Sequence, residues 1–205
     1  MTGEGLDLDG TAVQPGGRTP APGELAVVQA YINSFFDLEV DWGVDLFATP
    51  DRLADWLAAR GLIEAGTVLR ARDLTRAVTV REGLRALAAD NNDATDEIAG
   101  AGLAELNRAA AGARVEVRLD PGGPRFAPTG TGLDRALGIL LAMTARAMLD
   151  GSWRRLKACP GHDCGWAFYD HSRNQTGRWC SMSVCGGRAK ARAHYHRRRE
   201  EDERG

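Results

Sequence analysis

All four cysteines of this 205-residue chain lie within 27 residues, and this cluster constrains the fold more than any other feature of the sequence. They form two pairs, Cys159 with Cys164 and Cys180 with Cys185, and each pair encloses four residues. Fifteen residues separate the pairs. In a reducing compartment disulfides do not persist, so paired cysteines there point to metal or redox chemistry. Of these, a metal site is favoured, because two short loops can each supply two thiolates to a tetrahedral ion.

The spacing predicts one structural Zn²⁺ ion with four thiolate ligands: Cys159, Cys164, Cys180 and Cys185. Four thiolates leave no coordination position for an activated water, so the expected role of the metal is structural and not catalytic. Two alternatives remain open. The first is that a histidine replaces one cysteine, since all four histidines lie nearby: His162, His171, His194 and His196. The second is a rubredoxin-like iron site, although such sites usually have gaps of two residues.

The residues between the cysteine pairs suggest how the pairs meet. Gly165 to Tyr169 alternates like a strand, and Asn174 to Gly177 can turn the chain back toward Trp179. We therefore expect a hairpin that brings the two pairs together. Four apolar side chains are expected to form its small core: Trp166, Phe168, Trp179 and Met182. So small a module buries too little surface to fold alone, and zinc binding is expected to supply the missing stability.

Apolar residues spaced three to four apart predict a helical domain over residues 24–150. The expected helices cover 22–38, 50–60, 68–89, 94–111 and 132–150, and Thr49 before Pro50 is a typical N-cap. Alternation over 114–119, a Pro-Gly turn, and the short run 125–128 predict one β-hairpin. The expected fold class is mainly α with a small β-hairpin: a helical N-terminal domain, a four-cysteine finger and a basic helix after the finger.

The first 23 residues are rich in Gly, Pro and Thr and lack the basic start and apolar run of a signal peptide. They are expected to form a flexible arm. No stretch approaches the roughly 18 apolar residues of a membrane helix, so we expect a cytoplasmic protein without a membrane partner. The predicted organisation is an arm (1–23), a helical regulatory domain (24–150) and a finger with a basic helix (151–205), joined through residues 151–156.

The net charge of −2 conceals two oppositely charged parts. Residues 151–205 hold 12 Lys and Arg against 6 Asp and Glu, a net of +6, whereas residues 1–150 hold 14 against 22, a net of −8. A basic module favours a polyanionic partner, while a solvated helix face that contacts nothing is the alternative. The candidate nucleic-acid contacts are Arg173, Arg178, Arg188, Lys190, Arg192, Arg197 and Arg199.

A helix is expected from Arg188 onward, and its side chains are predicted to form a cationic stripe. At about 100° per residue, four of them fall within about 60° of one another: Arg188, Arg192, Tyr195 and Arg199. Arginine suits nucleic acid because its planar fork can bind a phosphate or a guanine edge at two points.

The segment from Cys159 to Asp170 reads CPGHDCGWAFYD, and the pattern continues through SRN at 172–174, RWCSM at 178–182 and CGGR at 185–188. This pattern resembles the CGNR zinc finger. Proteins of that family carry an N-terminal helical domain described as a stress-induced transcription regulator, and residues 24–150 look similar to it. One position departs from the motif, because Gly187 stands where the family has Asn. An Asn there could cap the following helix, and Gly is a weaker cap.

The resemblance implies a DNA-binding transcription regulator of the stress response, with the finger and its basic helix on duplex DNA. The N-terminal domain is expected to sense a small-molecule effector or to form a homodimer. Arg81 and Arg85, one turn apart, are candidates to meet an anionic ligand or to pair with acids of their own domain. An RNA-binding protein and a protein-interaction finger remain alternatives. No catalytic constellation or Gly-rich phosphate loop stands out, so we do not expect an enzyme.

Overall fold

The computed structural model describes residues 14–36, 44–92, 97–161 and 164–202. Its helices are α1 (Leu25–Ile32), α2 (Pro50–Ala59), α3 (Ala71–Asp90), α4 (Glu97–Ala109), α5 (Gly132–Leu149) and α6 (Gly187–Asp202). Its strands are β1 (Phe35–Phe36), β2 (Val44–Asp45), β3 (Val115–Asp120), β4 (Gly123–Pro128), β5 (Leu156–Ala158) and β6 (Ala167–Tyr169). Three short helices cover Pro15–Gly17, Ser152–Arg155 and Met182–Gly186. The expected class, mainly α with a small β-hairpin, is confirmed, and the described residues form small antiparallel strand pairs at three places.

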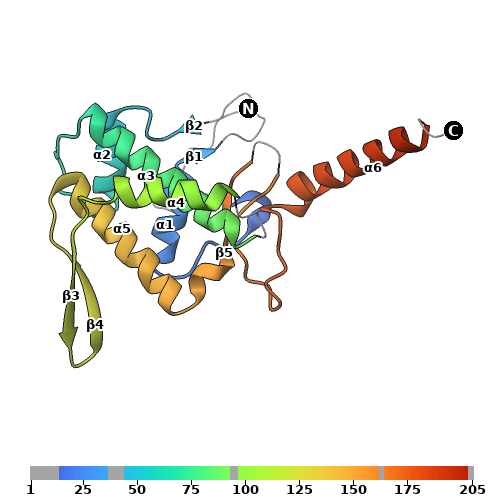
Figure 1. Cartoon of the computed structure of the whole chain (residues 1–205). Coiled ribbons are helices and arrows are strands. Elements are labelled where there is room, and N and C mark those ends of the chain that lie inside the picture. Colours follow the sequence, from blue (N-terminus) through green and yellow to red (C-terminus); the bar gives the residue numbers. More distant parts are fainter. Residues whose placement is uncertain (1–13, 37–43, 93–96, 162–163, 203–205) are drawn as a thin grey trace.

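The helices pack around α3, which contacts α1, α2, α4 and α5 (Figure 1). The hairpin β3–β4 projects from one side of this body, and α6 extends from the other (Figure 1). The central core is apolar, and its fully buried members include Val28, Ile32, Leu53, Leu57, Val80, Leu84, Leu137 and Leu140. Close approach of α4 to α3 requires Gly83, because a Cβ there would lie 2.6 Å from the Cβ of Leu106.

Helix α2 begins and ends where the sequence predicts. The Thr49 hydroxyl accepts a hydrogen bond from the backbone N–H of Arg52, at 3.2 Å, and Pro50 occupies the first helical position. The helix ends before Gly61, whose φ of +67° favours glycine. Trp56 from this helix packs with Tyr31 and Phe47, with ring centroids 5.3 to 5.8 Å apart.

Helix α1 is shorter than the 22–38 expected from its apolar spacing. It covers Leu25–Ile32, and the chain then turns into β1 at Phe35. Residues 37 and 38 lie outside the described part of the chain. The physical reason lies in Asn33 and Ser34, which are buried and use their side chains for tertiary hydrogen bonds where a helix would turn them to solvent.

The third helix also starts later than predicted. Helix α3 begins at Ala71, not at residue 68, because the Asp73 carboxylate accepts a hydrogen bond from the backbone N–H of Arg70 at 2.9 Å and so closes the first turn. Helix α4 is described from Glu97 to Ala109, and the start predicted at residue 94 lies outside the described residues. The hairpin predicted over 114–128 is confirmed as β3 and β4.

The main core continues past α5 into the cysteine-rich region. Trp153, Leu156, Ala158, Ala167 and Tyr169 belong to the same buried cluster as the residues of the helices. The first strand pair of the cysteine-rich region therefore packs directly on the helical body. In the part of the chain that the structure describes, no helix is both long and apolar enough to cross a membrane.

Candidate metal centre and nucleic-acid surface

The first cysteine pair sits in the connection between β5 and β6. These strands pair antiparallel, with Ala158 opposite Ala167, and the Cys159 N–H donates to the carbonyl oxygen of Trp166 at 2.9 Å. The predicted hairpin, with its turn at 174–177, was therefore wrong, because β6 pairs with β5 and not with the residues that follow this turn. The strand Ala167–Tyr169 pairs with residues 156–158, of which only Leu156 belongs to the linker predicted at 151–156, and three residues are too few to show an alternation pattern.

The second cysteine pair sits at the start of the C-terminal helix. The Ser181 hydroxyl accepts a hydrogen bond from the N–H of Val184, at 3.3 Å, and caps the short helix that contains Cys185 and runs into α6. This corrects the expectation for Gly187, which lies inside the continuous helical segment at φ −65° and so is not a cap. A Cβ there would meet the carbonyl oxygen of Met182 at 3.6 Å, an ordinary contact, so the position has room for a Cβ.

The four thiol sulfurs converge on one point and fit a Zn²⁺ ion. All four lie within 4.8 Å of one another, and the Cys164–Cys180 and Cys180–Cys185 sulfurs are each 3.6 Å apart. A tetrahedral ion with metal–sulfur bonds of about 2.3 Å has sulfur–sulfur edges of about 3.8 Å. Gly161 leaves the required room, because a Cβ there would lie 3.1 Å from the Cys185 sulfur. The cysteines therefore form the zinc site that the sequence predicts.

The thiols cannot all ionise without a cation. Hydrogen bonds from Cys164 and Cys180 lower the pKa of Cys159, so one thiolate forms readily. Its hydrogen bonds in turn raise the pKa of Cys164 and of Cys180, and burial raises the pKa of Cys185. A bound Zn²⁺ ion would neutralise the charge that four thiolates bring together, and its contribution to the finger is structural.

Among the described side chains, the ligand cluster contains cysteines only. His171 lies elsewhere, with its Nε2 atom 3.0 Å from the carbonyl oxygen of Pro20, and His194 is exposed on α6. Position 162 and the side chain of residue 196 lie outside the described part of the chain.

The core of the finger differs from its prediction in one member. Trp166 and Phe168 are buried with the four cysteines, and Trp179 packs against them. Met182, by contrast, is 54% exposed, so its assignment to the core was wrong. The reason is the continuous helix that begins at Met182, since this helix turns the side chain outward while Cys185 faces the sulfurs.

The segment before α1 packs against the finger. Gln14 is buried, and its side-chain oxygen accepts hydrogen bonds from Trp166 Nε1 at 3.0 Å and from Gln29 Nε2 at 2.9 Å. The arm expected at 1–23 thus has residues 14–21 held in place, whereas residues 1–13 lie outside the described part of the chain. Proline and glycine content could not indicate this, because the contacts come from side chains distant in sequence.

Arg18 in this segment holds the chain directly at the second cysteine pair. Its guanidinium donates to the carbonyl oxygens of Cys180 at 2.7 Å and Trp179 at 2.9 Å. The same group lies 4.8 Å from the ring centroid of Phe168. Arg18 therefore joins the backbone beside one zinc ligand to the apolar core of the finger, a role that sequence reasoning missed.

The helical body holds the finger through polar side chains. Asn33 pairs with Ala167 twice, donating to its carbonyl oxygen and accepting from its N–H, both at 2.8 Å. Asn92 donates to the carbonyl oxygens of Ala158 and Arg178, also both at 2.8 Å. Both asparagines are buried. The finger is therefore fixed in orientation on the body and not merely connected to it.

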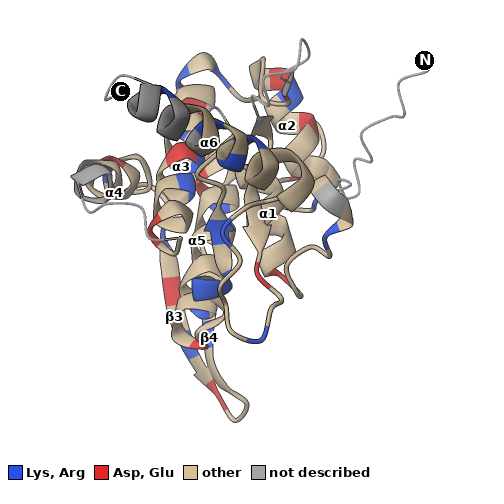
Figure 2. Ribbon diagram, turned by 90° about the vertical axis from the view of Figure 1, so that its right-hand side faces the viewer, with Lys and Arg blue, Asp and Glu red and all other residues tan. Residues whose placement is uncertain are grey.

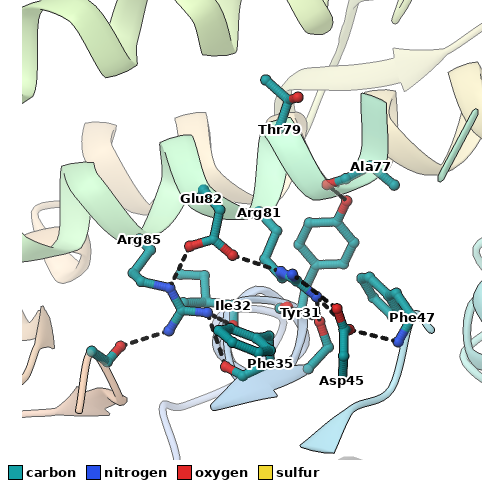
Figure 3. A network of polar contacts seen from close by, with 12 residues as sticks. Tyr31, Ile32, Phe35, Asp45, Phe47, Ala77, Thr79, Arg81, Glu82 and Arg85 are labelled. Carbon is teal, nitrogen blue, oxygen red and sulfur yellow. Dashed lines mark hydrogen bonds and ion pairs between the residues drawn. The ribbon is translucent and has the colours of Figure 1, made fainter. Parts of the chain in front are cut away.

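Arg81 and Arg85, the candidates for an anionic ligand, are paired with acids of their own domain (Figure 3). Glu82 accepts from both guanidinium groups at 2.8 Å, and Arg81 also donates to Asp45 at 2.8 Å. Beside them, burial raises the pKa of Tyr31, whose hydroxyl donates to the Ala77 carbonyl oxygen at 2.7 Å.

Arg85 links this network to the zinc centre. Its guanidinium donates to the carbonyl oxygen of Gly165, next to a zinc ligand, at 2.6 Å, and to the carbonyl oxygens of Ile32 and Phe35 at 2.7 and 3.0 Å (Figure 3). Gly165 has a φ of +56°, and the arginine reaches the carbonyl that this turn exposes. The α1–β1 connection, α3 and the first cysteine pair therefore share one side chain.

A buried ion pair organises the loop between β6 and the second cysteine pair. Lys157 and Asp170 are 3.1 Å apart, with side chains 7% and 1% exposed. Burial raises the pKa of Asp170, but hydrogen bonds from Ser172, Lys157 and the N–H of Gly177 outweigh it and lower the pKa to about 2. Gly177 is required here, because a Cβ would lie 2.9 Å from the carboxylate.

The candidate nucleic-acid contacts lie on two neighbouring parts of the finger. Arg173 and Arg178 are exposed on the loop held by the ion pair. Arg188, Lys190, Arg192 and Arg199 are exposed on α6, and the side chain of Arg197 lies outside the described part of the structure. Figure 2 marks Lys and Arg in blue along the described part of the ribbon.

Comparison with known families agrees with this geometry. Residues 155–198 match the model of the CGNR zinc finger, and residues 25–151 match the ABATE model, described as "Putative stress-induced transcription regulator". The chain belongs to the ABATE family. Its ABATE domain is followed directly by a CGNR finger, as the resemblance predicted. No curated protein matches the chain.

The boundaries of the two family matches show which contacts with the finger come from residues outside both family models. The ABATE match starts at the first residue of α1 and ends just after α5, and the CGNR match includes β5. Residues 14–21, which carry Gln14 and Arg18, lie outside both. The segment that braces the finger is thus a feature of this chain that neither family model covers.

Proposed function

We propose that this ABATE-domain protein is a transcription regulator that binds duplex DNA through its CGNR finger and α6. The observation that carries the proposal is the position of α6, a helix that leaves the body at the zinc centre and exposes basic side chains (Figure 1). An α-helix about 10–12 Å wide fits the major groove of B-form DNA, which is about 12 Å wide.

The loop on the finger would contribute from a second side. Arg173 and Arg178 lie on the loop that is fixed by the Lys157–Asp170 pair and by Arg155, which donates to the carbonyl oxygens of Asp170 and Ser172 at 3.0 and 2.9 Å. In this arrangement the loop contacts phosphates while α6 enters the groove. Phosphate contacts set orientation, and base contacts set sequence preference.

The ABATE domain would carry the regulatory part of the function, as a sensor of a small molecule or as a dimerisation unit. The contact of Arg85 with Gly165 supports this role, since it offers a direct connection from α3 to the first cysteine pair. We place the protein in the cytoplasm, where its four free cysteines would stay reduced and bind metal. We assign it no catalytic activity, because the zinc ligands leave no open position.

Removing the arginines of the α6 stripe is the first test of DNA binding. Replacing Arg188 and Arg192 together by Ala should weaken binding to a duplex about 30-fold or more, at about 1 kcal/mol for each lost contact. If both contact phosphates, the slope of log affinity against log salt should fall by about two. Arg135→Ala, an exposed arginine on α5, is the matched control and should change neither value.

The same titration separates duplex DNA from RNA. A structured RNA competitor that displaces the duplex at equal concentration would favour the RNA-binding alternative, because a finger with an Arg-rich helix also suits structured RNA. Unchanged affinity in the double variant would contradict the proposed role of α6.

A further inference from the structure

The hairpin β3–β4 carries an exposed apolar surface that the proposed function does not use. It projects away from the helices as a sheet of only two strands (Figures 1 and 2). Val117 and Leu119 on β3 are 61% and 81% exposed. The register places them opposite Phe126 and Pro124 on the same face of the sheet. A lone two-stranded hairpin is marginally stable in water, and additional strands stabilise it.

The two outer edges of this hairpin are not equivalent. The N–H of Thr129 donates to the carbonyl oxygen of Arg114 at 3.0 Å, so these residues form a hydrogen-bonded pair next to the ladder. Pairs alternate in an antiparallel ladder, and therefore the N–H and C=O groups of Val115, Val117 and Leu119 point away from β4. Among the described residues, no third strand pairs with that edge.

On β4 the corresponding outward positions are Pro124, Phe126 and Pro128. Proline has no N–H to donate, so two of these three positions can only accept a hydrogen bond from a further strand. Strand addition at the β4 edge is thus disfavoured, whereas the β3 edge keeps all its donors and acceptors.

The charges of β3 indicate which partner strand can pair with its open edge. Residues 114–120 read Arg-Val-Glu-Val-Arg-Leu-Asp, and their charges are opposite in sign about Val117. When two copies of this strand pair antiparallel about Val117, Glu116 faces Arg118 of the second copy and Arg114 faces its Asp120. Val115 then faces Leu119. Moving the centre to residue 116 or 118 sets like charges opposite each other, which is destabilising.

We propose that β3 pairs antiparallel with β3 of a second copy of this chain, centred on Val117, and so forms a homodimer. The pairing joins two hairpins into a four-stranded sheet and uses the outward backbone groups of Val115, Val117 and Leu119. It also makes the apolar surface continuous across the two copies, with Val117, Leu119 and Phe126 from each. This interface is independent of the finger, and loss of DNA binding would leave it intact.

Sedimentation equilibrium of the zinc-loaded full chain tests this pairing. The parent protein should be mainly dimeric when its concentration reaches about 0.1 mM. Glu116→Arg and Arg118→Glu should each raise the dimer dissociation constant at least about tenfold, because each sets two pairs of like charges opposite each other. Both residues are exposed. Glu105→Arg, the same charge change at an exposed position on α4, is the matched control and should leave the dimer unchanged.

Mixing the two variants gives the decisive arm. In a mixed dimer the arginines of Glu116→Arg protein face the glutamates of Arg118→Glu protein, so the mixture should associate as tightly as the parent. A merely structural effect of either substitution would not be reversed by mixing. A parent protein that stays monomeric, variants that dimerise like the parent, or a mixture that does not reassociate would each overturn the proposal.

Discussion

Removal of the metal is expected to unfold the finger from Cys159 to Cys185. The buried cluster at the zinc site consists of four cysteines, Trp166 and Phe168, so without metal it keeps two large apolar side chains and four thiols of which most stay protonated. Structural zinc sites contribute apparent binding energies on the order of 10 kcal/mol, which is comparable to the whole unfolding free energy of a typical domain. Chelation, or Cys180→Ala, should increase cleavage of the finger by trypsin at its two arginines, Arg173 and Arg178, and zinc should restore protection of the parent alone.

The effect of metal loss should reach the ABATE domain. Arg85, Asn33 and Asn92 bond to backbone groups of the finger, and the main core includes Leu156 and Ala167. Unfolding the finger removes these partners, so the thermal midpoint of the helices should fall as well. Ser183→Ala changes an exposed position between Cys180 and Cys185. This variant should still bind zinc, and the thermal midpoints of its finger and of its helices should equal those of the parent. A chelated protein whose finger still resists trypsin would contradict a structural role for the metal.

Breaking the Lys157–Asp170 pair is expected to have the second-largest effect. Asp170→Asn keeps the shape of the side chain but leaves the Lys157 ammonium, 7% exposed, without its counter-charge. Loss of one partner of a buried pair typically costs about 3–5 kcal/mol. Denaturant unfolding of the zinc-loaded protein measures this value. Lys157→Met in the same chain should recover part of the loss, since it removes the unpaired charge.

The pH dependence of this pair follows from the pKa of Asp170. Its folded value of about 2 lies below the ordinary 3.8, so the carboxylate contributes its full stabilisation above pH 3.8 and loses it as the pH falls toward about 2. Parent and Asp170→Asn proteins should therefore differ by the same free energy at about pH 7 and about pH 6. The exposed pair Arg146–Glu24 is the control, and Glu24→Gln should cost less than about 1 kcal/mol. Equal costs for the two substitutions would contradict the account of the buried pair.

Local sequence signals predicted those parts of the molecule that local interactions determine. The cap at Thr49, the stop at Gly61 and the hairpin over 114–128 all depend on neighbours within a few residues. The four zinc ligands could also be predicted from the sequence, because metal geometry restricts the residue types and spacings that can bind zinc.

Other features could not be predicted because they depend on contacts between distant segments. Strand β5 has three residues, and its identity comes from pairing with β6. The 14–21 segment looks like a flexible arm by composition, yet Arg18 bonds to carbonyl oxygens more than 160 residues away in sequence. The helix predicted over 22–38 was too long, because a single sequence gives no sign that the Asn33 side chain forms hydrogen bonds with the backbone of Ala167.

Selection of the zinc-loaded full chain on random duplex DNA tests the central claim most directly. At about 0.15 M salt, with an RNA competitor present, the proposed function predicts enrichment of a defined duplex site by the parent protein. Cys180→Ala protein should enrich none, because without the zinc site α6 and the 173–178 loop lose their relative positions. Two results would contradict a sequence-specific DNA-binding regulator: the parent enriches no duplex site, or the RNA competitor displaces it from the duplex.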